Sequence, residues 1–433
     1  MEFALTEEEE AVREAASGLF DGLITVERLQ AVESSTDRFD RELWAALGRS
    51  ELLGVALPEA DGGGDLGMVA LCLLLEAQGR RVAQVPLWST LAAAALPIAK
   101  FGSIQQKQRW LPGVSGGTVV LTAALTEVAV SAGIAGVGAS LVPGAASTDT
   151  TANWPIIPSV QAVPDPGVGP GAFRLTGYSA AVPWAHVADQ ILVPAATPGG
   201  GIILALVDPD ATGLSQVRAE TTNREIHCHL KFDGVPVSVE ALLGGGDPGN
   251  GAAMVRSILD GVWTGISALA LGVAESALAQ TSDYLNQREQ FGRPLSTFQG
   301  TMLRAADAAI DTAAMRATLW QAAWRLDTQR PASEAVAVAV WWASDAGQRV
   351  VHATQHLHGG MGADVDYPIH RYFLWNKQIE LLLGGPSAQL ARLGDMVAVA
   401  FDAEHGTSSR HRIDAESGAL TGVGIHAGVA ESR

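Results

Sequence analysis

The sequence has little of what marks several large classes of protein, and cysteine is the clearest shortage. Only Cys72 and Cys228 occur among its 433 residues, far apart and with no CxxC pattern or His/Cys cluster around them. This usage excludes a disulfide framework and gives no reason to expect a metal site. We therefore predict two buried free thiols, a reducing compartment and no bound metal.

Basic residues are scarce as well. Lys and Arg number 28 against 46 Asp and Glu, so the formal net charge is −18. Binding to nucleic-acid phosphates needs a basic face, and this balance argues against nucleic acid as a partner. A small anionic ligand is still compatible with it, because one Arg or one helix N-terminus can bind such a ligand.

Long apolar runs are missing too. The longest, around Thr90–Ala99 and Ala268–Ala279, are too short to span a bilayer or contain Glu275. The first ten residues are acidic and lack the apolar segment of a secretion signal. These observations predict a cytoplasmic protein without a membrane span.

What the chain does contain is two helical regions separated by a β-region. Residues 1–115 carry apolar side chains at helical spacing, and Thr6 with Glu9 has the spacing of a capping box. Further helices are predicted at Glu42–Arg49, Leu66–Gly79, Leu87–Lys100 and Gln105–Leu111. This part of the chain is therefore predicted to be an N-terminal helical domain.

Residues 116–246 are rich in Val, Thr, Gly and Pro, which favours short strands joined by turns. Strands are predicted at Val119–Ala124, Phe173–Leu175, Gln190–Pro194 and Ile202–Val207. Several prolines between Pro155 and Pro170 predict a long loop. The region is expected to form a mostly antiparallel, β-barrel-like middle domain.

Helical spacing returns in residues 247–403, with few helix breakers, which predicts a four-helix bundle. The helices are expected at Val255–Glu289, Gln299–Trp324, Ser333–Gly359 and Gln378–Ala398. Residues 404–433 lack apolar periodicity and are rich in Gly, Ser and His, so we predict a mobile tail. The fold class is thus α+β and multidomain, because runs of one element type follow runs of another.

Four short motifs stand out along the chain. They are FALTEEE at 3–9, AALTE at 123–127, REQFGRP at 288–294 and HLHGGMG at 356–362, the last followed by Tyr367, Pro368 and Arg371. In this order and spacing the chain resembles the acyl-CoA dehydrogenases over nearly its whole length. In that family FAD lies between the middle domain of one subunit and the bundle of a neighbour.

The resemblance implies which residues contact FAD, and elementary chemistry agrees for some of them. The guanidinium of Arg288 is permanently charged and forked, which suits a pyrophosphate. Glycines at 359 and 360 allow a backbone to approach a phosphate closely. The residues implied as cofactor-binding are Arg288, Gln290, Phe291, Gly292, His356, Gly359, Gly360, Leu125 and Thr126.

The chain departs from the family at the catalytic base. The family's reaction removes a proton from the α carbon of an acyl-CoA by a Glu carboxylate, while FAD accepts a hydride from the β carbon. The two places where members carry this Glu align with Gly384 and Val262, and neither residue can accept a proton.

Two acids lie near these positions. Asp260 is turned ~200° round a helix from Val262. Glu380 shares a face with Gly384 only if the helix continues between them. For both residues, a solvated or salt-bridged acid is the simpler interpretation.

A chain that keeps the flavin-contacting segment but lacks the base is similar to the Glu-less subunits of actinobacterial heteromeric acyl-CoA dehydrogenases that degrade steroid side chains. This implies an acyl-CoA substrate, a homologous Glu-bearing partner in a heterotetramer, and an electron-transfer flavoprotein as acceptor. Two alternatives stay open. One is an active homo-oligomeric enzyme whose base is Asp260 or Glu380, and the other is a flavin-free scaffold or binding protein.

Overall fold

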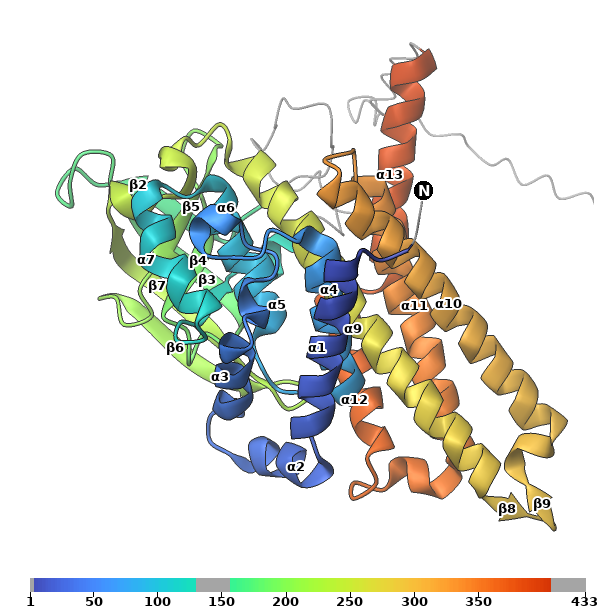
Figure 1. The fold of residues 1–433 in the computed structure, drawn as a ribbon. Helices are drawn as coiled ribbons and strands as arrows, with labels where there is room; N and C mark the ends of the chain where they lie inside the picture. The colour runs from blue at the N-terminus through green and yellow to red at the C-terminus, as the bar shows by residue number, and fades with distance from the viewer. Residues whose placement is uncertain (1–3, 130–155, 406–433) are drawn as a thin grey trace, which may run out of the picture.

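The computed structural model describes residues 4–129 and 156–405, arranged as helices, a sheet and a second set of helices (Figure 1). The sheet lies at one side of the molecule and the long helices of the second set lie at the other, with N-terminal helices over the sheet and in the centre of the view. The predicted α+β architecture is therefore confirmed. Most of the predicted mobile tail lies in residues 406–433, outside the described residues.

The N-terminal helices begin where their capping residues predict. α1 (Glu7–Leu23) follows Thr6, whose hydroxyl accepts a hydrogen bond from the Glu9 N–H at 3.2 Å, while the Glu9 carboxylate accepts one from the Thr6 N–H at 2.7 Å. Both bonds satisfy backbone donors that a helix start leaves unpaired. The other elements here are α2 (Val26–Ser34), α3 (Arg41–Arg49), α4 (Gly67–Arg81), α5 (Leu87–Thr90), the π-helical turn η3 (Leu91–Ala95), α6 (Leu96–Phe101) and α7 (Ile104–Ser115).

Seven strands of the described residues form one sheet in the order β1-β4-β2-β3-β7-β6, with β5 paired to β4. They are β1 (Leu121–Ala123), β2 (Val160–Pro164), β3 (Phe173–Pro183), β4 (Gln190–Ala196), β5 (Ile202–Val207), β6 (Leu214–Glu220) and β7 (Ile226–Val237). The pairs β1–β4 and β2–β4 are parallel and the other pairs are antiparallel. The predicted, mostly antiparallel β-region is confirmed.

Three strands differ from the sequence prediction. β2 lies inside the segment predicted as a loop, and the strand signals above do not include β6 and β7. β6 is the last strand of the sheet and exposes most of its side chains, so it has no apolar run to mark it. Strands of this kind are specified by pairing with a neighbour more than by their own sequence.

The second set of helices forms the bundle. It contains α9 (Gly251–Gln287), a short hairpin of β8 (Glu289–Gln290) and β9 (Arg293–Pro294), α10 (Gln299–Asp327), α11 (Ser333–Leu357), the 3₁₀ turn η7 (Gly359–Ala363), α12 (Ile369–Leu382) and α13 (Pro386–His405). The prediction of one helix over Gln378–Ala398 is wrong. Gly384 and Gly385 separate α12 from α13 with φ of 79° each, a conformation that suits glycine, and Pro386 then opens the next helix.

α9 is the central helix of the bundle and packs closely against α4. By length and composition it is the one helix in the described ranges that could cross a membrane, but 89% of its apolar window is buried inside the fold. A Cβ atom on Gly272 of α9 would lie 2.0 Å from the carbonyl oxygen of Glu76 in α4. A Cβ on Gly79 of α4 would lie 2.2 Å from the carbonyl oxygen of Leu269. The two backbones are therefore in direct contact.

This contact predicts the effect of adding one methyl group. Gly272→Ala should lower the free energy of unfolding by about 1–3 kcal/mol, because the new atom must displace the α4 backbone. Gly18→Ala is the matched control, since Gly18 lies in α1 with nothing within 4 Å of a Cβ, and it should gain about 0.5–1 kcal/mol from helix propensity. Urea denaturation measures both values. Equal stability of the two variants would contradict the close approach of α4 and α9.

Candidate functional site

The REQFGRP motif forms an exposed hairpin directly after α9. Arg288 leaves the helix in an extended conformation, and Phe291 and Gly292 make the turn with φ of 55° and 77°. Phe291 is 92% exposed and contacts Phe298 edge-on, with ring centroids 6.2 Å apart. The side chain of Arg288 is exposed, and no ion pair within the described part of the chain holds it. The hairpin therefore presents an aromatic ring and a cation outward.

The HLHGGMG loop lies at the same end of the bundle. His358 is buried, and its ring stacks on Tyr284 of α9 with centroids 4.4 Å apart. Its Nε2 lies 3.2 Å from the Thr281 hydroxyl. These contacts fix the loop against the last turns of α9, close to Arg288. Gly359, Gly360 and His356 are next to His358 in the chain and are exposed. A Cβ atom added to either glycine would meet nothing within 4 Å, so a ligand could approach the backbone at these glycines.

A cavity of about 300 Å³ lies far from this hairpin, between the sheet and the bundle. Leu125 and Thr126 of the AALTE motif line it. Its helical wall is one face of α9, because the spacing of Leu259, Val262 and Ile266 repeats each turn. The remaining wall comes from Trp88, Ala123, Ala129, Ala181, Pro183, Ala219, Glu220, Thr221, His227, His229, Trp263, Gln378, Leu381 and Leu382.

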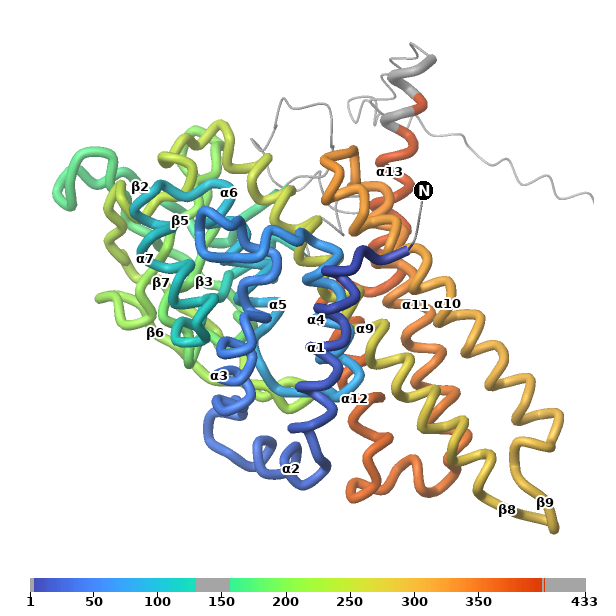
Figure 2. Tube along the Cα trace, viewed as in Figure 1, coloured from blue at the N-terminus to red at the C-terminus, as the bar shows by residue number. Residues whose placement is uncertain are grey.

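The structure thus divides the residues implied for FAD into two groups. Seven of them lie at the hairpin end of the bundle, which we call the clasp: Arg288, Gln290, Phe291, Gly292, His356, Gly359 and Gly360. Leu125 and Thr126 lie at the cavity. From Val262 to Arg288 the chain follows α9 for 26 residues, which at 1.5 Å per residue is about 39 Å. Figure 2 shows this course from the sheet side of the molecule to the hairpin tip.

The acids near the expected base positions point away from the cavity. Val262 lines it, whereas the Asp260 carboxylate lies on another face of α9 and accepts hydrogen bonds from Ser333 at 2.7 Å and Arg392 at 3.3 Å. Burial raises the pKa of Asp260, and burial lowers the pKa of Arg392 to about 10. The Arg392 guanidinium also lies 4.0 Å from the ring centroid of Trp263. Asp260 therefore belongs to a buried ion pair.

Glu380 is also held elsewhere. Its carboxylate accepts a hydrogen bond from Lys377 at 2.9 Å, while its neighbours Leu381 and Leu382 line the cavity. The helix ends at Leu382, so Glu380 and Gly384 do not share a helical face. Among the described residues that line the cavity, the one carboxylate is Glu220, which lies 2.9 Å from Arg38 and is half exposed.

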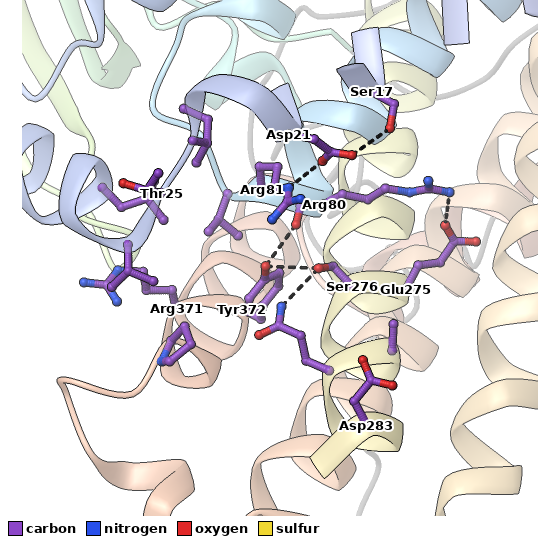
Figure 3. Close-up of a pocket in the computed structure, with 17 residues that line it drawn as sticks. Ser17, Asp21, Thr25, Arg80, Arg81, Glu275, Ser276, Asp283, Arg371 and Tyr372 are labelled. Atoms are coloured by element: carbon purple, nitrogen blue, oxygen red, sulfur yellow. Dashed lines mark hydrogen bonds and ion pairs between the residues drawn. The ribbon is translucent and has the colours of Figure 1, made fainter. Parts of the chain in front are cut away.

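A second cavity, of about 560 Å³, lies between α1, α2, α4, α9 and α12 (Figure 3). Its charged walls are largely neutralised within the chain: Arg81 pairs with Asp21 at 2.6 Å and Arg80 with Glu275 at 2.7 Å. The Tyr372 hydroxyl donates to the carbonyl of Arg80 at 2.9 Å. Figure 3 shows these groups joined to one another across the seam between the helices. We interpret this cavity as a gap where the N-terminal helices pack against the bundle, and not as a ligand site.

Comparison with known proteins identifies the family to which the chain belongs. The family model of the acyl-CoA dehydrogenase N-terminal domain matches residues 6–118, and that of the acyl-CoA dehydrogenase C-terminal domain matches residues 249–396. The chain belongs to the acyl-CoA dehydrogenase family, whose members are FAD-dependent oxidoreductases acting on CH–CH bonds. The sequence-based resemblance is therefore confirmed.

Three similar proteins narrow the position within the family. Acyl-CoA dehydrogenase FadE27 of Mycobacterium tuberculosis is 35% identical over 92% of this chain and 99% of its own length. A structure of the Tcur3481–Tcur3483 steroid ACAD is 46% identical, covers 91% of this chain and 99% of that chain, and has a TM-score of 0.79. The ChsE4–ChsE5 complex from M. tuberculosis is 34% identical, covers 92% and 99%, and has a TM-score of 0.80. The chain thus resembles steroid-type, heteromeric members.

The polar side of the cavity is not among the features predicted from the sequence. His227 and His229 alternate with Cys228 along β7, so both histidines face the cavity and the cysteine faces away, fully buried. In His227-Cys228-His229 polar and apolar residues alternate, as is typical of a strand with one buried face, and this alternation could have predicted the strand. Trp263 carries no such signal, because a tryptophan in a core helix is usually packing.

The buried His358 predicts a pH dependence of stability. Burial lowers the pKa of His358 below its ordinary 6.5. As the pH falls through about 6.5, the unfolded chain therefore takes up a proton that the folded chain does not, and stability is lost. His358→Phe keeps the stack on Tyr284 but removes this proton, so it should reduce the loss of unfolding free energy between pH 7.5 and 5.5. His356→Gln, exposed and two residues away, is the control and should retain the wild-type slope.

Proposed function

We propose that this chain is one subunit of an FAD-dependent acyl-CoA dehydrogenase, and that its clasp completes the FAD site of a homologous, Glu-bearing partner subunit. The length of α9 carries this proposal. The clasp lies about 39 Å along the helix from the cavity of the same chain, so both cannot contact one flavin ring and its pyrophosphate within a single chain. An exposed Phe291 beside an Arg288 that no described residue pairs with suits a surface that a second subunit covers.

The clasp fits the pyrophosphate end of FAD. Arg288 can donate a forked pair of hydrogen bonds to phosphate oxygens, and the exposed Gly359–Gly360 backbone leaves room for the phosphates to approach. Phe291 can cover an apolar part of the cofactor or of the partner. Bound FAD supplies the hydride acceptor of the reaction. This chain's contribution is to hold one end of the cofactor and to exclude water from it.

Neither expected position of the base offers a free carboxylate to the cavity. Val262 is apolar, Asp260 is held by Arg392 and Ser333, and Glu380 is held by Lys377. No observation on the described residues favours either acid as a base, and the partner would supply the carboxylate. The substrate is then an acyl-CoA thioester. The similarity to steroid-type complexes suggests one with a steroid side chain, oxidised in the cytoplasm by a heterotetramer that passes electrons to an electron-transfer flavoprotein.

Flavin content tests the clasp. The chain expressed alone should contain little FAD and show no dehydrogenation, while co-expression with a Glu-bearing homologue should restore both. In the complex, Arg288→Ala removes a charge-assisted contact of about 1.5–3 kcal/mol, so FAD should bind roughly 10- to 100-fold more weakly. The flavin absorbance of the purified complex measures how much FAD is bound. Arg49→Ala, exposed at the end of α3, is the control. A lone chain that is fully loaded and active would refute the proposal.

A second variant tests the alternative base. Glu380→Gln in the co-expressed complex should leave kcat unchanged, because the Glu380 carboxylate points to Lys377 and away from the cavity. Steady-state turnover with retained flavin absorbance is the measurement. A loss of turnover in a variant that keeps its flavin would identify Glu380 as the base and favour an enzyme that is active on its own. Asp260→Asn is a poorer test, since it leaves Arg392 buried beside a neutral group.

A further inference from the structure

The outward side of α10 is apolar where a solvent-facing helix usually carries charged residues. Figure 1 shows α10 at the outer edge of the molecule, on the side away from the sheet. Seven exposed residues of this helix are apolar: Met302, Leu303, Ala306, Ala309, Ile310, Ala313 and Ala317. At about 100° per residue they occupy an arc of roughly 120°, which is the width of a packing face. We call this set of residues the α10 stripe.

The α10 stripe is separate from the face that α10 packs into the bundle. The buried residues of the helix are Ala308, Thr312, Met315, Leu319, Ala322 and Ala323. Their common direction is about 150° round the helix from that of the stripe. α10 therefore has two apolar faces, and the described part of the chain covers the inner one.

The outer face is large enough to be a contact surface. Its three large side chains, Met302, Leu303 and Ile310, are 51%, 58% and 67% exposed. From Met302 to Ala317 the stripe is about 22 Å long. Scattered apolar side chains on a surface are ordinary, but a continuous apolar strip of this length indicates a protein–protein contact.

The charges beside the stripe favour a second copy of this chain as the partner. The net charge of the chain is −18, so two copies repel each other wherever acidic surfaces meet. The stripe itself has no charged residue, and a groove of about 650 Å³ beside it is lined by Arg304, Arg349, Asp307 and Asp311. Burial lowers the pKa of His352 in the same groove, so this residue adds no charge at pH 7. The surface is therefore balanced in charge, as a contact between like chains requires.

The order of large and small side chains along the stripe is self-complementary. In an antiparallel pair of α10 helices with a two-fold axis at residue 308, residues equally far from 308 on opposite sides lie level with one another. Leu303 of one copy is then level with Ala313 of the other, and Ile310 is level with Ala306. Each large side chain meets a small one, so the ridges of one helix fit the grooves of the other.

We propose that the α10 stripe packs against the α10 stripe of a second copy of this chain, antiparallel and across a two-fold axis. A contact of this symmetry is closed, because the same patch serves on both sides. It brings Arg304 of each copy within one residue of the level of Asp311 of the other, so opposite charges border the apolar contact. Two copies of the chain then lie at the centre of the assembly, and each keeps its clasp for a Glu-bearing subunit. The inference goes beyond the proposed function, since this contact involves neither FAD nor a catalytic carboxylate.

The mass in solution, measured by multi-angle light scattering, tests the contact. The full chain expressed alone should be a dimer, and Ala313→Arg should make it a monomer, because the substitution buries an unpaired charge near the centre of the stripe. In the co-expressed complex the same substitution should halve the mass. Ala15→Arg, at an exposed position of α1, is the control and should change neither mass. A monomeric wild-type chain, or an Ala313→Arg complex of unchanged mass, would overturn the proposal.

A cross-link identifies the occupant of the stripe without disrupting it. Ala309 lies one residue from the proposed axis, and the native Cys72 and Cys228 are buried. Ala309→Cys should therefore give a covalent dimer of this chain under mild oxidation, both alone and in the complex, whereas Ala15→Cys should not. Absence of this dimer would contradict the proposal. Shielding of the introduced thiol from maleimide in the complex would then show that the Glu-bearing subunit covers the stripe.

Arg288→Ala separates this proposal from that of the clasp. It should lose FAD from the complex and keep the covalent dimer formed by Ala309→Cys. Ala313→Arg should do the reverse, because the separated pairs still have an intact clasp and keep their flavin absorbance. A thermal unfolding curve like that of the wild type shows that the Ala313→Arg chain is folded. Failure of either proposal thus leaves the other standing.

Discussion

A buried ion pair between Glu33 and Arg371 joins the N-terminal helices to the bundle, beside a turn of the sheet. Arg371 of α12 donates from Nε at 2.8 Å and from Nη2 at 3.0 Å to the carboxylate of Glu33 in α2, and both side chains are more than 90% buried. Arg224, in the turn between β6 and β7, lies 3.6 Å from the same carboxylate. Leaving one buried partner alone in the interior would cost about 3–5 kcal/mol, so this pair holds α12 against α2, while the more exposed Arg224 adds a weaker contact from the sheet.

The same turn carries the polar end of the cavity. Gln378 of α12 accepts a hydrogen bond from the Thr222 N–H at 3.2 Å, and Gln84 donates to the carbonyl of Asn223 at 3.2 Å. The strand that follows this turn bears His227. The turn before β7 is therefore held by contacts from the bundle and from the N-terminal region as well as by the sheet. Trp88 of α5, the sheet and α9 all line this cavity, so its walls come from all three parts of the chain.

The sequence predicted those features whose cause is local. The capping box at Thr6 depends on a few neighbouring residues, and the structure confirms it. The break at Gly384–Gly385 is local too, but the helical periodicity on both sides of the two glycines conceals it. Most of the architecture therefore follows from periodicity, caps and motifs.

The cavity could not be predicted in this way because its walls come from pairings between distant segments. His227 lies beside Pro183 and Ala219 only through strand register, which no single segment encodes. Similarly, the sequence places Asp260 near the base position but does not show that its partner is Arg392, 132 residues later. A sequence gives the type of each side chain, but the charge balance of a site depends on partners that only the fold brings together.

The geometry of α9 keeps the cavity and the clasp structurally independent of each other. A single rigid helix joins the cavity to the clasp, and its length keeps them about 39 Å apart whatever side chains line either end. Under the proposed function, the clasp acts on a neighbouring subunit and requires a cation, an exposed ring and two glycines. The residues that line the cavity are separate from those of the clasp. Val262 can therefore stand where other members carry a carboxylate without any movement of the clasp. Because α9 separates the cavity from the clasp, substitutions at one do not alter the other. Two homologous subunits could therefore differ in their cavities and keep the same clasp.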